Sequence, residues 1–114
     1  MDKSIENLTK QSCNSIPDNA FPLNHAEIMQ YEEIVPEWIL IEDKEIAREF
    51  KFDNFQKAID FINEVAEISE SENHHPDILL HGWNKITINL STHKIKGLSE
   101  NDFILAAKIN ELVD

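Results

Sequence analysis

Apolar positions recur at helical spacing in three stretches of the chain. The first stretch follows Asn24 and Glu27, which have the spacing of a capping box, and stops at Pro36. The second has Asp53 as its predicted N-cap and carries the clearest stripe, at Phe55, Ala58, Ile59, Ile62, Val65 and Ala66. The third follows Ser99 and comprises Phe103, Ala106, Ala107, Ile109 and Leu112. Helices are therefore predicted near residues 25–34, from 54 to a point before Pro76, and from 100 onward.

Between these helices the pattern changes to alternation, which is typical of strands. Residues 38–41 form a short β-favouring run, and residues 46–52 alternate in a way that fits a hairpin with it. Residues 78–80 and 86–91 indicate a second pair of strands. The order is α-β-β-α-β-β-α with no long parallel crossover, so we predict an α+β fold: a four-stranded antiparallel sheet with helices packed on one face.

The first 20 residues are polar and show neither the helical nor the strand period of apolar positions. Residues that favour turns and disorder cluster in 14–19. We interpret residues 1–20 as a flexible N-terminal arm and residues 21–114 as a single domain. A chain of 114 residues can bury one hydrophobic core but not two.

Composition narrows the class of protein. Hydrophobic residues make up 41% of the chain and charged residues 28%, which is ordinary globular usage, and no apolar run approaches the length of a membrane span. The single cysteine, Cys13, and the lack of a signal-peptide pattern make the cytoplasm the expected location. A net charge of −12 argues against nucleic acid or anionic membrane as a partner.

The reactive side chains are concentrated between residues 70 and 102. This segment holds the pair His74 and His75 and a third imidazole at His93, and imidazoles titrate near neutral pH and suit proton transfer. An antiparallel strand pairing would bring His93 back beside the pair. His93 can lie on the polar side only if the strand alternation breaks near Thr92, at a bulge or a strand end.

These residues form a pattern, Glu70-x3-His74-His75-Pro76-x6-Trp83-x9-His93-x8-Asp102, that resembles the active-site pattern of the pterin-4a-carbinolamine dehydratase family. Flanking segments are also similar to that family: Phe50-x-Phe52-x-x-Phe55, Thr92-His93 and Gly97-Leu98-Ser99-x-x-Asp102. The resemblance covers about residues 23–113. One departure is Lys96-Gly97, where members of the family often have two glycines, so the backbone here is less permissive.

The resemblance implies the dehydration of 4a-hydroxytetrahydropterin to quinonoid dihydropterin, without a metal or an organic cofactor. It implies a place in recycling the pterin of aromatic amino acid hydroxylases, with a functional link to phenylalanine hydroxylase, and a homodimer or homotetramer. We assign the base role to His74 and the acid role to His93, although the two could be exchanged, and substrate binding to His75, Pro76, Trp83 and Thr92. Glu70 and Asp102 would support the imidazoles through hydrogen bonds.

Several of these residues have a second interpretation. Asp102 has the spacing of a capping partner for Ser99, Trp83 could belong to the core, and Glu70 could be a solvated carboxylate. The three histidines could instead bind zinc, although none is paired at the i, i+4 spacing of a helical zinc motif. At the level of the whole protein, the alternatives are a dimerisation cofactor that binds another protein, and a related pterin role such as molybdopterin metabolism.

Overall fold

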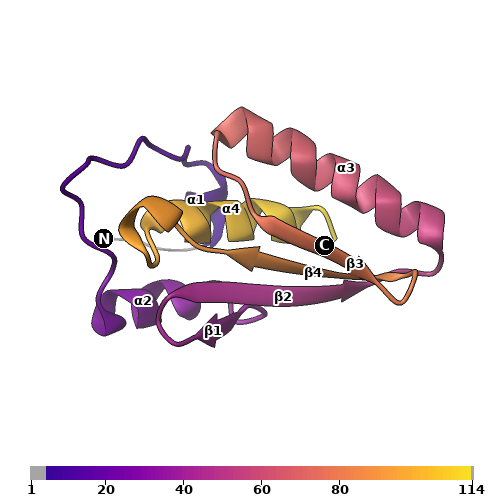
Figure 1. The fold of residues 1–114 in the computed structure, drawn as a ribbon, viewed down its shortest axis with the longest axis horizontal. Coiled ribbons are helices and arrows are strands. Elements are labelled where there is room, and N and C mark those ends of the chain that lie inside the picture. Colours follow the sequence, from indigo (N-terminus) through magenta and orange to yellow (C-terminus); the bar gives the residue numbers. More distant parts are fainter. Residues whose placement is uncertain (1–4, 114) are drawn as a thin grey trace.

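A computed structural model describes residues 5–113 of the chain, with nine elements in sequence order (Figure 1). They are α1 (Ile5–Thr9), α2 (His25–Glu32), β1 (Ile39–Ile41), β2 (Glu45–Lys51), α3 (Phe55–Glu72), β3 (Asp77–His81), β4 (Lys85–Leu90), the 3₁₀ turn η1 (His93–Ile95) and α4 (Glu100–Glu111). The strands form one antiparallel sheet in the order β1-β2-β4-β3. The predicted α+β class and the α-β-β-α-β-β-α order are confirmed.

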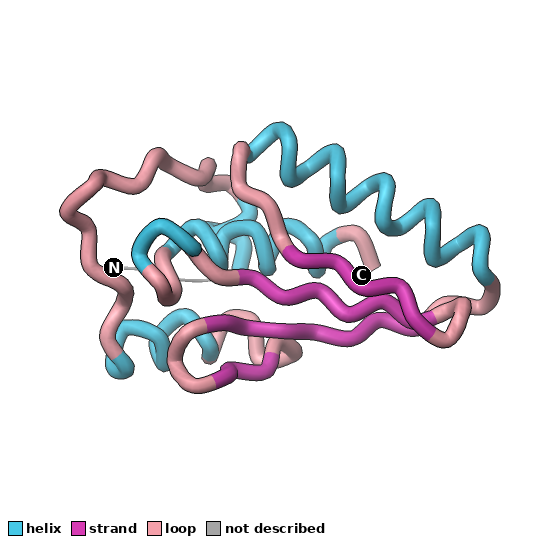
Figure 2. The backbone as a smooth tube through the Cα atoms, viewed as in Figure 1, coloured by secondary structure: helices cyan, strands magenta, loops and turns pink. Residues whose placement is uncertain are grey.

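The sheet buries one face and leaves the other open, as Figure 2 shows for the strands and the helices that lie along them. Alternate residues of the two central strands are buried beneath the helices, namely Ile46, Phe50, Ile86, Ile88 and Leu90. Their neighbours along the strands, such as Glu49 and Lys51, are exposed. This alternation is the period-2 pattern that predicted the strands.

Helix α4 is the central element of the core. Residues 101–107 of this helix are all buried. Near its C-terminal end the Asn110 side-chain oxygen accepts hydrogen bonds from the Trp38 indole Nε1 at 2.8 Å and from Arg48 Nη1 at 2.5 Å. These bonds tie α4 to the β1 and β2 region, and they satisfy polar groups that would otherwise be costly to bury.

The start of α3 differs from the prediction by one residue. The N-cap is Asn54, whose side-chain oxygen accepts the Lys57 N–H at 2.8 Å, and not Asp53. Both residue types cap helices well, so local sequence did not discriminate between them. Asp53 instead lies 3.4 Å from the Lys57 ammonium, as an exposed ion pair.

Residues 5–20 contain regular structure that the sequence did not predict. Helix α1 packs against α4, and Leu8 is buried in the common core. A helix of five residues is too short to show a hydrophobic period, which explains why the pattern missed it. Residues 1–4 lie outside the described part of the chain. The flexibility of the arm and the domain boundary near residue 20 stay predictions.

Within residues 5–113, no helix combines the length and the apolar character that crossing a bilayer requires.

Candidate active site

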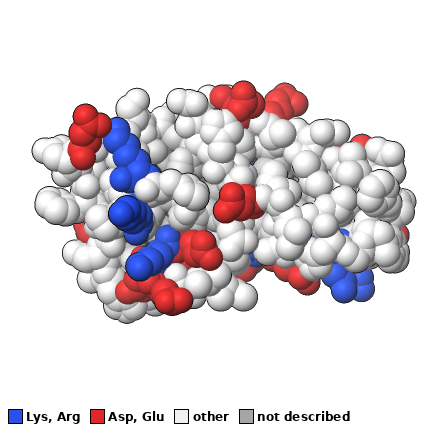
Figure 3. Space-filling view, in the orientation of Figure 1, with Lys and Arg blue, Asp and Glu red and all other residues white. Residues whose placement is uncertain are grey.

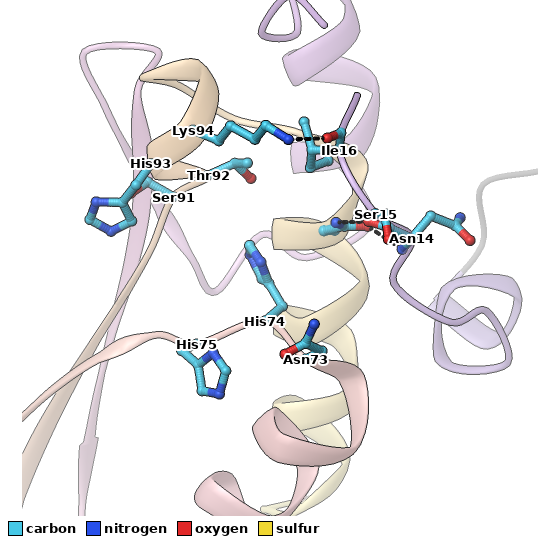
Figure 4. A pocket seen from close by; sticks show the side chains of 11 residues that line it. Asn14, Ser15, Ile16, Asn73, His74, His75, Ser91, Thr92, His93 and Lys94 are labelled. Carbon is cyan, nitrogen blue, oxygen red and sulfur yellow. Dashed lines mark hydrogen bonds between the residues drawn. The ribbon is translucent and has the colours of Figure 1, made fainter. Parts of the chain in front are cut away.

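A pocket of about 420 Å³ lies at the end of the sheet where β3 begins and β4 has ended. Four segments line it: residues 14–16 from the N-terminal region, 73–75 after α3, 91–94 after β4, and Asn101 of α4. Figure 4 shows the three rings of His74, His75 and His93 at this pocket, across from residues 14–16. The structure therefore brings together the three histidines that the sequence singled out.

The end of α3 places the first two histidines. Asn73 is the C-cap and takes the left-handed conformation, with φ at 52°, so the chain turns out of the helix at this residue. His74 and His75 follow at once, and Pro76 keeps His75 out of the α region before β3 starts. The helix thus delivers both imidazoles to the mouth of the pocket.

The end of β4 places the third histidine. The strand stops at Leu90, and an isolated antiparallel bridge between Thr92 and Gly97 closes a short loop that contains η1. His93 is the first residue of η1 and is exposed. The predicted break in the alternation near Thr92 is therefore present, as a strand end.

His74 is supported by a buried carboxylate. Its Nε2 lies 2.6 Å from Asp102 Oδ1, where the His74 side chain is 12% exposed and the Asp102 side chain is fully buried. The other oxygen, Asp102 Oδ2, accepts the Thr92 hydroxyl at 2.8 Å and the Ser99 backbone N–H at 2.9 Å. Because the Thr92 hydroxyl uses its hydrogen in the bond to Asp102, it is the acceptor in the 2.7 Å hydrogen bond with the Ser99 hydroxyl.

His75 is supported by a carboxylate at the surface. Its Nε2 lies 2.5 Å from Glu70 Oε2, on the last turn of α3. Both side chains are more than half exposed. Asp102 and Glu70 thus each support one imidazole of the adjacent pair, one in a dry environment and one in water. The first is the stronger constraint on ring orientation because burial strengthens the interaction.

Two residues predicted for substrate binding do not line the pocket. Trp83 lies in the turn between β3 and β4, at the far end of β3 from the histidines and separated from them by roughly 17 Å of strand. It is 62% exposed, so the alternative that Trp83 belongs to the core is wrong, and its role in substrate binding stays a prediction. Pro76 follows the lining residue His75 in the sequence but does not itself line the pocket. Thr92 does line it.

The sequence did not identify the rest of the lining. Residues 14–16 fall within the predicted N-terminal arm. The sequence gives no signal for Asn73, Ser91, Lys94 and Asn101 beyond their position next to predicted site residues. Only the fold shows that the arm crosses this end of the sheet.

Among the side chains that the structure describes, residues 7–113, no three His, Cys, Asp or Glu groups lie closely enough together to bind a metal ion. His74 Nε2 is directed to Asp102 rather than toward His75 and His93.

Comparison with known proteins identifies the family of the chain. The model of the family described as pterin 4 alpha carbinolamine dehydratase matches residues 21–112. A putative pterin-4-alpha-carbinolamine dehydratase of Halorhodospira halophila is 46% identical over 106 residues, which cover 92% of this chain and 96% of the relative. A relative of the same name from Alkaliphilus metalliredigens is 43% identical over 108 residues, covering 94% and 96% of the two chains.

Among solved structures, the crystal structure of a transcriptional coactivator/pterin dehydratase from Brucella melitensis superposes with a TM-score of 0.76 at 28% identity, covering 82% of this chain and 99% of that one. Three findings indicate the same family: a family match over most of the chain, full-length relatives above 40% identity, and a shared fold. The chain belongs to the pterin-4a-carbinolamine dehydratase family.

Proposed function

We propose that the protein is a hydro-lyase that dehydrates 4a-hydroxytetrahydropterin to quinonoid dihydropterin. Family membership supports the reaction class. The observation that carries the proposal is the placement of His74 and His93 on one pocket, with His74 backed by the buried Asp102 carboxylate. The reaction needs a base and an acid on one bound substrate, and the pocket offers both.

His74 acts as the base because Asp102 fixes its tautomer. The buried carboxylate accepts a hydrogen bond from the His74 Nε2–H group, so Nδ1 keeps the lone pair that can remove a proton. The same carboxylate stabilises the imidazolium that forms. His93 acts as the acid from the loop after β4, and His75, oriented by Glu70, binds the pterin ring.

In the reaction, His74 removes the proton of the ring nitrogen next to C4a. The electron pair of that N–H bond forms a C=N bond with C4a, and the C4a–O bond breaks. The hydroxyl leaves with a proton from His93 as water. His74 has gained one proton and His93 has lost one, so exchange with solvent returns both groups to their starting states.

The test is stopped-flow absorbance of 4a-hydroxytetrahydropterin decay with the protein and with His74→Ala and His93→Ala. Each variant should lose about 10²–10⁴-fold in turnover while staying folded, because each removes a positioned proton-transfer group. His25→Ala is the matched control, since His25 pairs with Asp43 at an exposed site and is not part of the pocket lining. Full activity in either pocket variant would remove that residue from the mechanism.

We further propose that this reaction recycles the pterin of an aromatic amino acid hydroxylase in the cytoplasm, and that the protein works as a homodimer or homotetramer. A coupled assay with phenylalanine hydroxylase should show faster cofactor turnover when the protein is added. Light scattering on a sizing column measures the assembly. A hydroxylase rate that does not respond would separate this protein from pterin recycling.

A further inference from the structure

Residues 13–18, which we refer to as the strap, pass along one side of the pocket, and residues 14–16 line it. Resting on the proposed function, we propose that the strap contacts the bound pterin and that Asn101 and Lys94 are positioning residues that hold it in place. The strap then determines how tightly the substrate binds, whereas the histidines determine how fast it reacts. In Figure 1 the chain between α1 and α2 arches over this end of the molecule.

Asn101 fixes the middle of the strap by two reciprocal hydrogen bonds. Its side-chain oxygen accepts the Asn14 backbone N–H at 3.0 Å, and its side-chain nitrogen donates to the Asn14 backbone oxygen at 2.8 Å. Asn101 is buried in the first turn of α4, one residue before Asp102. The same turn of helix therefore positions both the strap and His74.

Lys94 holds the strap from the other side of the pocket. Its ammonium donates to the Ile16 backbone oxygen at 2.6 Å, an interaction drawn in Figure 4, and lies 2.9 Å from the Asp18 carboxylate. Lys94 follows His93 directly in η1. A proposed proton donor and a strap anchor are thus consecutive residues.

A third anchor lies at the start of the strap. The Cys13 backbone N–H donates to Glu72 Oε1 at 2.8 Å, and Glu72 Oε2 accepts Lys108 Nζ at 2.5 Å. Burial acts to raise the pKa of Glu72, but the hydrogen bonds from Lys108 and Cys13 outweigh it and lower that pKa, which keeps this acceptor ionised. Burial, followed by the nearby Glu72 charge, raises the pKa of the Cys13 thiol to about 12, so this thiol is neutral at physiological pH.

These anchors leave Asn14, Ser15 and Ile16 as the part of the strap that lines the pocket. They lie across the pocket from His75 and His93, so a flat ring in contact with the imidazoles meets the strap on its other side. No strap side chain among these three can act as an acid or a base at neutral pH. Contact with them can add binding energy, and it does not add a proton-transfer step.

The experiment compares the wild type with Asn101→Ala and Lys94→Met by steady-state kinetics on 4a-hydroxytetrahydropterin. Loss of the anchoring hydrogen bonds should raise KM about threefold to tenfold in each variant while kcat stays within twofold of the wild type. Lys57→Met is the matched control, because it also removes a lysine from an ion pair, at 3.4 Å from Asp53 near the start of α3, away from the pocket. Its KM should be unchanged.

Hydrogen–deuterium exchange of the segment 11–18 provides a readout that does not depend on turnover. Exchange at the Cys13 and Asn14 amides should be faster in Asn101→Ala than in the wild type. Addition of 7,8-dihydrobiopterin, which has no 4a-hydroxyl to lose, should slow exchange in this segment of the wild type. If Asn101 only stabilised α4 and the strap did not contact the pterin, KM would not change in Asn101→Ala. The dihydropterin would then also fail to slow exchange in the wild-type segment.

The outcomes separate the two proposals. In one outcome the wild type accelerates dehydration, and the variants show faster exchange in the strap but an unchanged KM. That result overturns the strap inference and leaves the proposed dehydratase activity standing. An equal fall in kcat and kcat/KM in the variants also overturns it, since the anchors would then act on chemistry. A wild type that neither accelerates dehydration nor shows protection by the dihydropterin overturns the proposed function, and the strap inference with it.

Discussion

Asp102 accepts hydrogen bonds from three groups that come from different parts of the chain: the His74 ring, the Thr92 hydroxyl and the Ser99 backbone N–H. One buried carboxylate therefore joins the end of α3, the loop after β4 and the first turn of α4. The two interpretations of Asp102 in the sequence, helix capping and support of a histidine, are both present in the geometry. Spacing alone could not show this, because it does not reveal that the first turn of α4 faces His74.

The Asp102→Asn variant tests the role of this carboxylate. The amide keeps the size of the side chain and one acceptor oxygen but no longer carries the charge that fixes the His74 tautomer and stabilises its imidazolium. We expect kcat to fall about 10–100-fold, in line with other residues that support a catalytic group. Stopped-flow absorbance measures the rate, and thermal unfolding checks the fold.

The control for this variant is Glu70→Gln, which alters the exposed pair with His75 and should have the smaller effect. If Asp102→Asn retains full kcat, the carboxylate is a helix cap only. A second comparison is Asp102→Ala, which leaves the Thr92 and Ser99 donors buried without their acceptor and should lower the free energy of unfolding by about 1–3 kcal/mol.

Glu32 makes stability depend on pH. Within the described chain its Oε2 atom is buried without a hydrogen-bond partner, and burial together with the nearby Glu37 charge raises the pKa of Glu32 to about 7. The folded protein therefore binds this proton more tightly than the unfolded chain does. The associated stability is present below the unfolded pKa near 4.5 and is lost as the pH rises to about 7.

The Glu32→Gln variant should accordingly have a higher Tm than the wild type at pH 8, and the difference should shrink at pH 5.5. Gln resembles the protonated form of Glu and does not ionise, so it avoids the buried charge at high pH. Differential scanning calorimetry at the two pH values measures the effect. A Tm difference that is independent of pH would show that Glu32 is already solvated when ionised.

At the scale of elements, the strands and the three long helices were predictable because each has a clear hydrophobic period. The predicted helix over residues 25–34 is α2, and the predicted strand near residues 78–80 is β3. What failed was local: the N-cap of α3 lies one residue later than predicted, and α1 was missed. Each failure depends on tertiary contacts that a single segment does not encode.

The pocket, too, was predictable only in part. The three histidines could be predicted because the spacing of their segment is informative and antiparallel pairing returns the chain to its start. The strap could not, because its contacts with Asn101 and Lys94 join residues that are 87 and 78 positions apart. Polar backbone contacts of that range leave no periodic signal in the sequence.

The loop between β4 and α4 depends on a close contact at Gly97. A Cβ atom added there would lie 2.7 Å from Pro22 Cβ, which is closer than side-chain packing permits. Next to this contact the Leu23 backbone N–H donates to the Leu98 oxygen at 2.8 Å. Lys96 takes the left-handed conformation, with φ at 55°, which a glycine would adopt without strain.

We predict that Gly97→Ala lowers the free energy of unfolding by about 1–3 kcal/mol, because the new methyl group overpacks against Pro22 and both residues belong to fixed backbone. Urea unfolding measures the change. Lys96→Ala, at the exposed neighbouring position, should change stability by much less. Equal effects at the two positions would show that the loop moves to make room.

At the scale of the whole molecule, charge is unevenly distributed. The chain has a net charge of −12, yet Figure 3 shows a band of cationic side chains, drawn in blue, at the end where η1 and the strap lie. Carboxylates elsewhere outnumber their cationic partners, and their mutual repulsion lowers the stability of the compact state. Lys94 is one cation at this end, and it is paired with Asp18.

Screening should therefore stabilise the protein. Raising NaCl from about 0.02 to about 0.5 M shortens the Debye length about fivefold and should raise Tm by about 2–5 °C. Thermal unfolding followed by circular dichroism provides the measurement, with an equal concentration of an uncharged osmolyte as the control. A fall in Tm with salt would mean that the ion pairs, and not the excess of carboxylates, dominate.

The two tryptophans of the chain lie in opposite environments, and each can report on a different event. Trp38 is fully buried and donates its indole N–H to Asn110, whereas Trp83 is 62% exposed in the β3–β4 turn. Acrylamide should quench the fluorescence of Trp83 and spare that of Trp38. In a Trp83→Phe variant the fluorescence would come from Trp38 alone and would follow global unfolding. Trp38 is not part of the pocket lining, and no introduced label is needed.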